Sequence, residues 1–464
     1  MEDKREIDLA LRAVRKAMTR KQFLALMGVG GLLCAGAGAG FYKYNSFKSN
    51  GRGKVVIIGG GAAGISMASR LLSYLKNPDI TIIDPSDTHY YQPGFTLIAS
   101  GVYSPDEVGK PQADCMPSGA KWLKDSVTFV DTQKKLVKTS KNGDVKYDFL
   151  VLAPGLKIDW NGVEGISYET LGQGDAYCIY DYNGAIKTWQ GLQKFVKNGG
   201  RGIYTDTYTK HKCGGAPKKI CLLSEHLFRK NSNRDKAAFE FYTASNELYD
   251  VPYFTPRLLQ IYKQRGIGLN LNTRVKGIDT AAKKVHFTRS VKNPDTNKVE
   301  SIDFTKDYDF LHFLPPMGAP DFVKESGLSD TEGSHASEGW AATDKETLVH
   351  KKFKDIICLG DVAGIPTSKT SAAIRKQVPI AAKNLCLIME GKQPEFKYDG
   401  YAACPIVTDY GHVLMCEFDY DKKPKISFPL DFFFDMSHEQ WVAWLLKVYV
   451  LKPMYFYGML NGLV

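Results

Sequence analysis

The stretch K-V-V-I-I-G-G-G-A-A-G, residues 54–64, decides the fold. Its first five residues form a continuous apolar run rich in β-branched side chains, which predicts a buried parallel strand. Glycines follow at once, and residues 65–74 then show the apolar spacing of a helix. Gly59 permits a tight turn, Gly61 lets a pyrophosphate approach the backbone, and Gly64 allows helix and strand to pack closely. The stretch therefore predicts a strand, a turn and a helix that bind a dinucleotide.

An acidic residue stands where such a site needs one. The next apolar strand, 80–83, ends in Asp84, twenty residues after Gly64, where a carboxylate contacts the ribose of a dinucleotide. The start of the helix offers backbone N–H groups and a positive dipole to the phosphates. We expect the contacts to come from Gly59, Gly61, Ala62, Ala63, Gly64 and Asp84. The alternative is a glycine-rich turn with nothing bound.

Two later segments resemble those of flavoproteins with two dinucleotide-binding domains. Y-D-F-L-V-L-A-P-G, residues 147–155, is similar to their strand-and-turn motif and ends in Gly155. I-I-C-L-G-D, residues 356–361, is similar to their late strand and ends in Gly360 and Asp361. In that family the aspartate bonds the ribityl chain of FAD. The resemblance implies FAD as the cofactor, and an FAD domain split by an inserted second domain.

The inserted domain lacks a second glycine fingerprint. Its candidate strand, 201–205, runs into D-T-Y-T-K, residues 206–210, a turn without glycine. A pyrophosphate needs bare backbone at that turn. We therefore expect no nicotinamide site there, and an electron donor small enough to reach the flavin directly.

One cysteine is surrounded by positive charge. Cys213 stands in K-H-K-C-G-G-A-P-K-K, residues 210–219, among four lysines and a histidine. Nearby cations lower the pKa of a thiol and favour the reactive thiolate. The Gly-Gly-Ala-Pro that follows predicts a bare loop through which a flavin or small anion can approach. The alternative is a surface loop with an incidental cysteine.

This segment and several later ones resemble the type II sulfide:quinone oxidoreductases, and the similarity runs from Lys54 to the end of the chain. The motifs are K-C-G-G-A-P-K-K-I (212–220), L-L-S-E (222–225), F-L-P-P-M (313–317), D-K-E-T-L (344–348), P-T-S-K-T-S-A-A (366–373), Y-D-G-Y (398–401) and C-P (404–405). Members oxidise hydrogen sulfide to sulfane sulfur or polysulfide at FAD and a redox cysteine, and pass two electrons to membrane quinone. The resemblance implies Cys213 as catalytic cysteine. It also makes Lys369 a candidate for holding a quinone oxygen or the charge of the reduced flavin; a surface lysine is the alternative.

The second redox cysteine of the family is absent from its usual place. It commonly follows the Gly-Asp pair, where this chain has Val362. Cys178 resembles a third cysteine found in some members and is the candidate catalytic partner of Cys213. Two other cysteines, Cys221 and Cys358, are interpreted as core residues. No role is assigned to Cys115, Cys386, Cys404 or Cys416.

Two rival functions stay open. One is the flavoprotein subunit of a sulfide dehydrogenase that reduces cytochrome c, which shares the fold. The other is an FAD-containing sulfane-sulfur carrier or sensor with little turnover, which Val362 suggests.

The C-terminal stretch, residues 441–464, predicts contact with a membrane surface. It carries only Lys447 and Lys452 as charges, and Pro453 is expected to split it into two pieces too short to span a bilayer. Trp, Tyr and Lys mixed with Leu and Val are typical of amphipathic helices in the interface, which makes the enzyme monotopic, with quinone entering nearby. The alternative is a C-terminal helix buried against the sheet.

The N-terminus predicts a targeting segment. T-R-K-Q-F-L, residues 19–24, resembles a twin-arginine export signal with Lys21 in the second arginine position. An uncharged run, 23–39, and small-residue exits follow. The interpretation is export to the periplasmic face of a membrane; an uncleaved anchor and a buried helix are the alternatives.

Composition excludes several classes of protein. The 464 residues allow two or three domains, and 44% hydrophobic with 24% charged residues is ordinary globular usage. A net charge of +11 suits anionic membranes or ligands, but no basic block with aromatics indicates nucleic acid. Nine cysteines without a C-x2-C pair indicate neither a disulfide scaffold nor a metal site. A homo-oligomer is left open.

The expected fold is therefore α/β, with two Rossmann-like dinucleotide-binding domains and an amphipathic C-terminal membrane-binding segment. In chain order the domains are an export signal or anchor (1–52), the first part of the FAD domain (53–160), a second Rossmann-like domain without an NAD fingerprint (161–340), the second part of the FAD domain (341–400) and a quinone and membrane-interface region (401–464).

Overall fold

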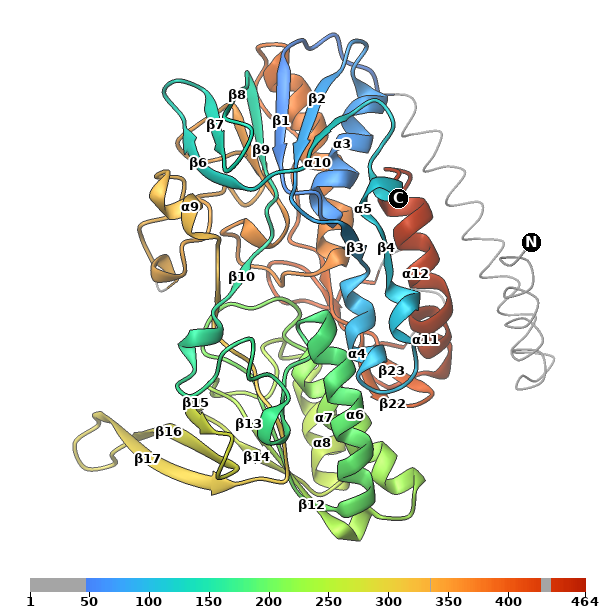
Figure 1. The fold of residues 1–464 in the computed structure, drawn as a ribbon, viewed down its shortest axis with the longest axis vertical. Coiled ribbons are helices and arrows are strands. Elements are labelled where there is room, and N and C mark those ends of the chain that lie inside the picture. The colour runs from blue at the N-terminus through green and yellow to red at the C-terminus, as the bar shows by residue number, and fades with distance from the viewer. Residues whose placement is uncertain (1–46, 334, 427–434) are drawn as a thin grey trace, which may run out of the picture.

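The computed structural model describes residues 47–333, 335–426 and 435–464. Two five-stranded parallel sheets, each accompanied by helices, form two halves that lie one above the other in Figure 1. This is the mixed α/β fold with Rossmann-like domains that the glycine-rich stretch predicts. The expected export signal falls within residues 1–46, outside the described residues.

The first sheet has the order β20-β9-β1-β2-β5, from strands Ile356–Cys358, Phe149–Leu152, Lys54–Ile58, Asp79–Ile83 and Lys121–Leu123. β1 is buried because it pairs in parallel with β2 on one side and β9 on the other. The helix α3 (Ala62–Tyr74) follows the glycine turn, and α10 (Ser371–Met389) packs against α3. β20 enters this sheet only after the whole second sheet has been built, so the first domain is split in sequence.

The second sheet has the order β11-β18-β12-β13-β14, from strands Ala176–Tyr177, Phe310–His312, Gly200–Thr205, Ala237–Tyr242 and Ile267–Asn270. Its helices are α6 (Tyr182–Asn198), α7 (Ala216–Lys230) and α8 (Thr255–Gln264). Aromatic rings fill the space between helices and sheet; Phe195, for example, stacks on Phe310 with ring centroids 5.2 Å apart. Such a core fixes β12 in the centre, and with it the loop that follows β12.

Smaller elements surround the two sheets. Two antiparallel three-stranded sheets are β6-β7-β8 (Val127–Asp131, Leu136–Thr139, Asp144–Lys146) and β15-β16-β17 (Thr273–Asp279, Lys284–Lys292, Val299–Asp307). Short pairs are β3-β4 (Thr88–Tyr90, Gly109–Pro111) and β10-β19 (Lys157–Ile158, Met317–Gly318). Short helices are α4 (Phe95–Ile98), α5 (Gln112–Cys115) and α9 (Asp321–Glu325). Figure 1 shows β10 at the waist between the two halves.

The C-terminal region is built from short strands and a helical run. The strands are β21 (Ala402–Ala403), β22 (Ile406–Asp409), β23 (His412–Leu414) and β24 (Glu417–Phe418). The run consists of α11 (Trp441–Leu445), a π-helix (Leu446–Val450), α12 (Leu451–Pro453) and a second π-helix (Met454–Met459). The predicted break at Pro453 is wrong: the wider π turns on both sides accommodate the proline, whose φ of -58° is helical.

One side of this helical run is anchored to the first domain. The Tyr455 hydroxyl lies 2.7 Å from His89 Nε2, Ser69 Oγ donates to Leu460 O at 2.6 Å, and Lys452 lies 2.7 Å from Glu107. Tyr449, Val450 and Tyr457 of the same run remain exposed, and Lys110 of β4 reaches the Tyr457 hydroxyl at 3.2 Å. Within the described residues no helix is long and apolar enough to cross a membrane.

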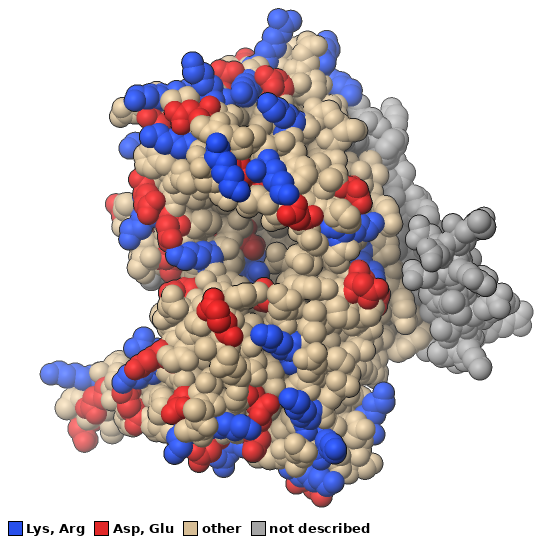
Figure 2. All heavy atoms as spheres, viewed as in Figure 1, with Lys and Arg blue, Asp and Glu red and all other residues tan. Residues whose placement is uncertain are grey.

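Charged side chains are unevenly spread over the face seen in Figure 2. Lysines, arginines and acidic residues are most numerous over the upper and lower ends of this face, and groups of both signs also lie on either side of a central hollow.

Candidate active site

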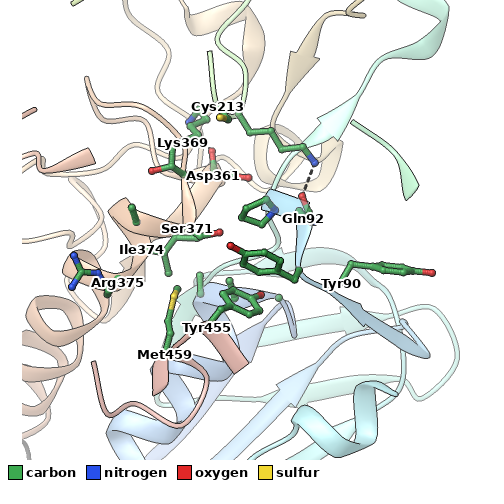
Figure 3. Close-up of a pocket in the computed structure, with 18 of the residues that line it drawn as sticks. Tyr90, Gln92, Cys213, Asp361, Lys369, Ser371, Ile374, Arg375, Tyr455 and Met459 are labelled. Atoms are coloured by element: carbon green, nitrogen blue, oxygen red, sulfur yellow. Dashed lines mark hydrogen bonds between the residues drawn. The ribbon is translucent and has the colours of Figure 1, made fainter. Parts of the chain in front are cut away.

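A cavity of about 520 Å³ lies where the first sheet, the loop after β12 and the C-terminal helices meet. Figure 3 shows Cys213, Asp361 and Lys369 on one side of it and Tyr455 and Met459 on the other. The carboxyl ends of parallel strands are the usual place for such a site, because the loops there converge. Polar and apolar groups from opposite ends of the sequence thus share one space.

The glycine turn after β1 forms one wall of the cavity. A side chain added at Gly61 would meet no atom within 4 Å, so the backbone there is open to a ligand. Gly59 has a φ of +103°, and a Cβ there would lie 2.2 Å from Ala153 O. At Gly64 a Cβ would lie 1.8 Å from Gly59 O, so helix and strand touch at this point. Gly59 and Gly64 therefore have the backbone geometry that the sequence predicts, and Gly64 lies outside the cavity lining.

Two further positions complete this wall. Asp84, at the end of β2, accepts a hydrogen bond from Gly60 N at 2.7 Å and still lines the cavity. Gly155 has a φ of +77° and open space around its Cα, beyond the end of β9. The Gln112 amide donates to Gly60 O at 2.8 Å and fixes the turn; no motif in the sequence marks this residue. Bare backbone, a helix N-terminus and a carboxylate are together what a dinucleotide requires.

The end of β20 adds a buried charge cluster. Burial raises the pKa of Asp361, and the nearby ammonium groups of Lys212 and Lys369 oppose that rise. Lys369 Nζ donates to Asp361 O at 2.6 Å and to Ala363 O at 3.0 Å, and it lies 3.8 Å from the centroid of the Trp340 ring. Burial lowers its pKa to about 8. Lys369 is thus a buried cation on the cavity wall and not a surface lysine.

The loop after β12 brings Cys213 to the cavity. Asp206 is the first residue of this loop. Its carboxylate lies 2.8 Å from Lys218 Nζ, and both side chains are buried. The helix α7 begins only at Ala216, so ten residues of loop separate β12 from it. Cys213 has a φ of +51°, a conformation that side-chain-bearing residues rarely adopt. Its N–H donates to Lys369 O at 3.0 Å and its carbonyl accepts from Tyr180 OH at 3.1 Å, which holds this backbone in place.

A second cysteine lies against Cys213. The two Sγ atoms of Cys213 and Cys404 are 3.0 Å apart, and Lys219 Nζ lies 3.3 Å from Cys213 Sγ. The hydrogen bond from Cys404, followed by the Lys219 ammonium, holds the pKa of Cys213 well below that of a free thiol, against the effect of burial. The same hydrogen bond, with burial, raises the pKa of Cys404. The Lys219 ammonium beside Cys213 thus favours Cys213 over Cys404 as the thiolate of the pair.

The prediction that Cys178 is the partner of Cys213 is wrong. Cys178 is fully buried after β11, and burial raises its pKa to about 12, so it stays a neutral thiol away from the cavity lining. Val362 is packed in an apolar cluster behind the cavity. Local sequence did not single out Cys404 as the partner, because its position depends on how the C-terminal strands pack over α7. The sequence feature that could have identified Cys404 is the Cys404-Pro405 pair, which is one of the segments that resemble the family.

The C-terminal helices close the cavity with apolar side chains and one buried cation. Leu446, Val450, Met454 and Met459 line it. Lys447 is buried, donates to Pro93 O at 3.1 Å, and has its pKa lowered to about 7 by burial. The Lys447 ammonium also favours the thiolate form of Cys213.

Most of the predicted site residues thus lie in one place. The cavity is lined by Gly59, Gly61, Ala62, Ala63, Asp84, Gly155, Cys213, Asp361 and Lys369. Gly64, Gly360 and Cys178 lie outside its lining. Of the lysines around Cys213 in sequence, only Lys219 contacts the sulfur, since Lys212 donates to Gln92 and Lys218 to Asp206.

Comparisons with known proteins agree with this arrangement. A family model described as pyridine nucleotide-disulphide oxidoreductase matches residues 53–185. A mitochondrial sulfide:quinone oxidoreductase of Dictyostelium discoideum is 38% identical over 410 residues, which cover 88% of this chain and 86% of that protein. The mouse protein of the same name is 34% identical over 413 residues, covering 88% and 86%. The sulfide:quinone oxidoreductase of Aquifex aeolicus superimposes with a TM-score of 0.71 at 20% identity, covering 89% of this chain and 92% of that one, which shows the fold alone.

Proposed function

The chain belongs to the sulfide:quinone oxidoreductase family, and we propose that it oxidises sulfide to sulfane sulfur or polysulfide and passes two electrons to a membrane quinone. It is an FAD-dependent oxidoreductase. The observation that carries the proposal is that Cys213, with Lys219 Nζ 3.3 Å from its sulfur, lies in the same cavity as the glycine turn and the apolar C-terminal helices. The motif around Cys213 further supports assignment to type II of the family.

FAD belongs in the cradle formed by the glycine turn and the strand ends. Gly61 and Gly155 leave open space there, and Asp84 and Asp361 present carboxylates to a ribose and a ribityl chain. The N-terminus of α3 offers its free N–H groups to phosphates. Bound FAD supplies the two-electron chemistry, taking electrons from sulfur and giving them to quinone. Lys369 adds a buried positive charge on the same wall.

Cys213 is the proposed redox cysteine. The Lys219 ammonium stabilises its thiolate, and together with Lys447 gives the inner cavity a positive potential that attracts anionic sulfide. The left-handed backbone at Cys213 is held by hydrogen bonds from two other parts of the chain, so the sulfur keeps its direction between turnovers.

The quinone is assigned to the C-terminal side of the cavity. Leu446, Met454 and Met459 present the apolar surface that a quinone ring needs. Lys447 lies among them with a pKa of about 7, so near neutral pH it can give up a proton to a reduced quinone.

We propose that the exposed side of the same helices binds the membrane. Tyr449, Val450 and Tyr457 are exposed there, whereas Tyr455 is hydrogen-bonded to His89 of the first domain. We assign this side to the lipid interface, where aromatic rings are favourable. The relatives carry "mitochondrial" in their names, which favours a mitochondrial membrane over the periplasmic face that the N-terminal sequence suggested.

The test uses the purified, detergent-solubilised flavoprotein without oxygen. Sulfide is expected to bleach the flavin, and a short-chain quinone to restore its colour; NADH in a separate cuvette is expected to do neither. A Cys213→Ser variant should retain FAD yet lose bleaching by sulfide. Normal sulfide turnover in that variant, or bleaching by NADH alone, would overturn the proposal.

A second candidate is the sulfane-sulfur carrier or sensor. It is favoured by Val362, which is buried where relatives commonly place a redox cysteine. It predicts a stable persulfide and slow reoxidation by quinone in the same experiment.

A further inference from the structure

The outer strand of the antiparallel sheet β15-β16-β17 has one open edge. β17 pairs with β16 along its whole length without a bulge. At one end of this ladder Asn293 N donates to Lys298 O at 2.9 Å. At the other end Tyr308 N donates to Lys283 O at 3.1 Å. Because hydrogen-bonded positions alternate, the backbone N–H and C=O groups of the odd-numbered residues 299–307 point away from β16. Among the strands that the structure describes, none pairs with this edge.

This edge lacks several features that usually protect an edge strand. Folded proteins cover such a strand or interrupt it with a proline or a bulge. β17 has neither proline nor bulge, and Figure 1 shows the hairpin of β16 and β17 extending from the body of the second domain. Apolar side chains are exposed on it: Val299 is 70% and Ile302 is 51% exposed. A long, regular and partly apolar edge of this kind can pair with another strand.

The charges of β17 select the strand that fits it. When two copies of β17 run antiparallel with Asp303 at the two-fold axis, Glu300 of each copy lies opposite Lys306 of the other. Moving the axis to Ile302 places Lys298 opposite Lys306, and moving it one residue the other way places Ile302 opposite Lys306. Opposite charges directly across a strand pair are favourable, and like charges are not. The sequence of β17 is therefore complementary to itself in one register.

The two Asp303 side chains that meet at this axis are each compensated within their own copy. The Asp303 carboxylate lies 2.7 Å from Lys276 Nζ and accepts a hydrogen bond from Thr288 Oγ1 at 2.7 Å. Each copy thus brings its own cation to the point where the two carboxylates approach. The like charges of Asp303 therefore do not exclude this register.

Apolar contacts favour the same register. Tyr242 stacks on Phe287 with ring centroids 4.2 Å apart, and Phe287 stacks on Phe304 at 5.3 Å. Ile302 lies two residues before Phe304 on the same face of β17, and it is exposed at the end of this row. In the two-fold pair, Ile302 of each copy lies opposite Phe304 of the other, so the apolar row continues across the axis.

We propose that two copies of this chain associate through antiparallel pairing of their β17 strands, so that the three strands of each copy form one continuous sheet. None of the described residues that line the cavity belongs to β15, β16 or β17, so each copy keeps its own active site. The proposal therefore goes beyond the proposed function and does not depend on it.

The first test measures the protein mass of the purified, detergent-solubilised holoenzyme by light scattering during size-exclusion chromatography, at several protein concentrations. Wild type is expected to be a dimer at the higher concentrations. Glu300→Lys and Lys306→Glu should each raise the dissociation constant by about tenfold or more, because like charges then oppose each other twice. The two substitutions combined should restore the dimer. Glu247→Lys makes the same charge change at an exposed residue elsewhere in the second domain, and it should leave the dimer unchanged.

A proline on the open edge tests the backbone pairing. The N–H of Ser301 points away from β16, so Ser301→Pro removes a donor of the proposed pair and none of the β16 ladder. We expect this variant to be monomeric. Ser301→Ala, the matched control, should remain a dimer, and thermal unfolding of both variants checks that the fold is intact.

A cysteine on the axis tests the register. Residues of a hydrogen-bonded antiparallel pair have Cα atoms about 5.5 Å apart, a distance that a disulfide bridges. Asp303→Cys should therefore form a covalent dimer under mild oxidation. Ser301→Cys, which faces Thr305 of the other copy, should form none beyond the level of wild type.

The proposal fails if wild type is monomeric at all concentrations, which would leave the edge to a strand of a different protein. A dimer that survives both Ser301→Pro and Glu300→Lys would place the contact on another surface. Failure of the combined charge exchange to restore the dimer would refute the register. Sulfide:quinone turnover of the monomeric variants should stay within about twofold of wild type. Absence of turnover in a dimeric wild type would refute the proposed function and leave this proposal standing.

Discussion

The Sγ atoms of Cys213 and Cys404 lie 3.0 Å apart although 191 positions separate them in the chain. Cys213 comes from the loop after β12, in the second domain, and Cys404 comes from the C-terminal strands. Lys219 on α7 and Lys447 on the C-terminal helix contribute charge to the same point. The reactive sulfur therefore sits where three separate parts of the chain meet.

Removing Lys219 should make Cys213 less reactive near neutral pH. The folded protein holds the pKa of Cys213 below that of a free thiol, partly through this ammonium, so Lys219→Met should raise it and lower the thiolate fraction. We expect alkylation of Cys213 by iodoacetamide at neutral pH to slow by about tenfold, with its pH profile moved upward. Lys230→Met, at the other end of α7, is the control; equal rates in the two variants would contradict the assignment.

Substitutions at two glycines of the same turn should have different effects: one should lower FAD binding and the other should lower stability. Gly61 faces open space, so Gly61→Val should fold but fill the position of the pyrophosphate, lowering FAD content by about tenfold or more. At Gly64 a Cβ would lie 1.8 Å from Gly59 O, so Gly64→Ala should lower the melting temperature of the apoprotein itself. Flavin absorbance per protein and thermal unfolding of the apoproteins measure the two effects. Full FAD content in Gly61→Val would contradict the assigned cradle.

Lys447 should make stability depend on pH. Burial lowers its pKa to about 7, so between about pH 7 and 10 the unfolded chain binds a proton that the folded protein does not. The contribution of Lys447 to the free energy of unfolding therefore rises with pH between about pH 7 and 10. Below pH 7 Lys447 is charged in the folded protein, and the cost of burying that charge lowers stability in full. We expect Lys447→Met to stabilise the fold by on the order of 5 kcal/mol near pH 6 and by little near pH 10.

Thermal unfolding followed by circular dichroism at both pH values checks this prediction. Lys452→Met, on the same helical run but paired with Glu107, is the control and should show no such difference between the two values. A pH-independent effect of Lys447→Met would show that its ammonium is not buried in the charged state.

The exposed tyrosines of the C-terminal helices should determine membrane binding. Tyr449 and Tyr457 are 49% and 59% exposed, and Val450 is exposed beside them. We expect Tyr449→Ser with Tyr457→Ser to weaken binding to vesicles of phosphatidylcholine and phosphatidylglycerol by about tenfold or more, because two rings leave the lipid interface. Tyr253→Ser, 47% exposed in the second domain, is the matched control. Vesicle flotation measures the bound fraction, and equal binding of all variants would refute this surface.

Local sequence was enough for the dinucleotide fold. β1, the glycine turn and α3 form as predicted because each depends on neighbours in sequence: β-branched residues for the strand, absent side chains for the turn, apolar spacing for the helix. Gly155 and Asp361 were found for the same reason, since each follows a strand of the first sheet directly. Patterns of neighbouring residues do not predict which distant cysteine contacts Cys213 in the folded protein.

By itself, the sequence determined the α/β fold, the dinucleotide cradle and the lysines near Cys213, because each of these depends on residues that are contiguous in the chain. Only the tertiary structure decided that Cys404 and not Cys178 is the partner of that thiol, that Lys219 alone of the loop lysines contacts the sulfur, and that the helix continues through Pro453. The physical reason is that these contacts arise where the C-terminal strands and helices pack over α7 and the first domain. The distances from Cys213 Sγ to Cys404 Sγ and to Lys219 Nζ are set by the packing of these segments and not by local propensity.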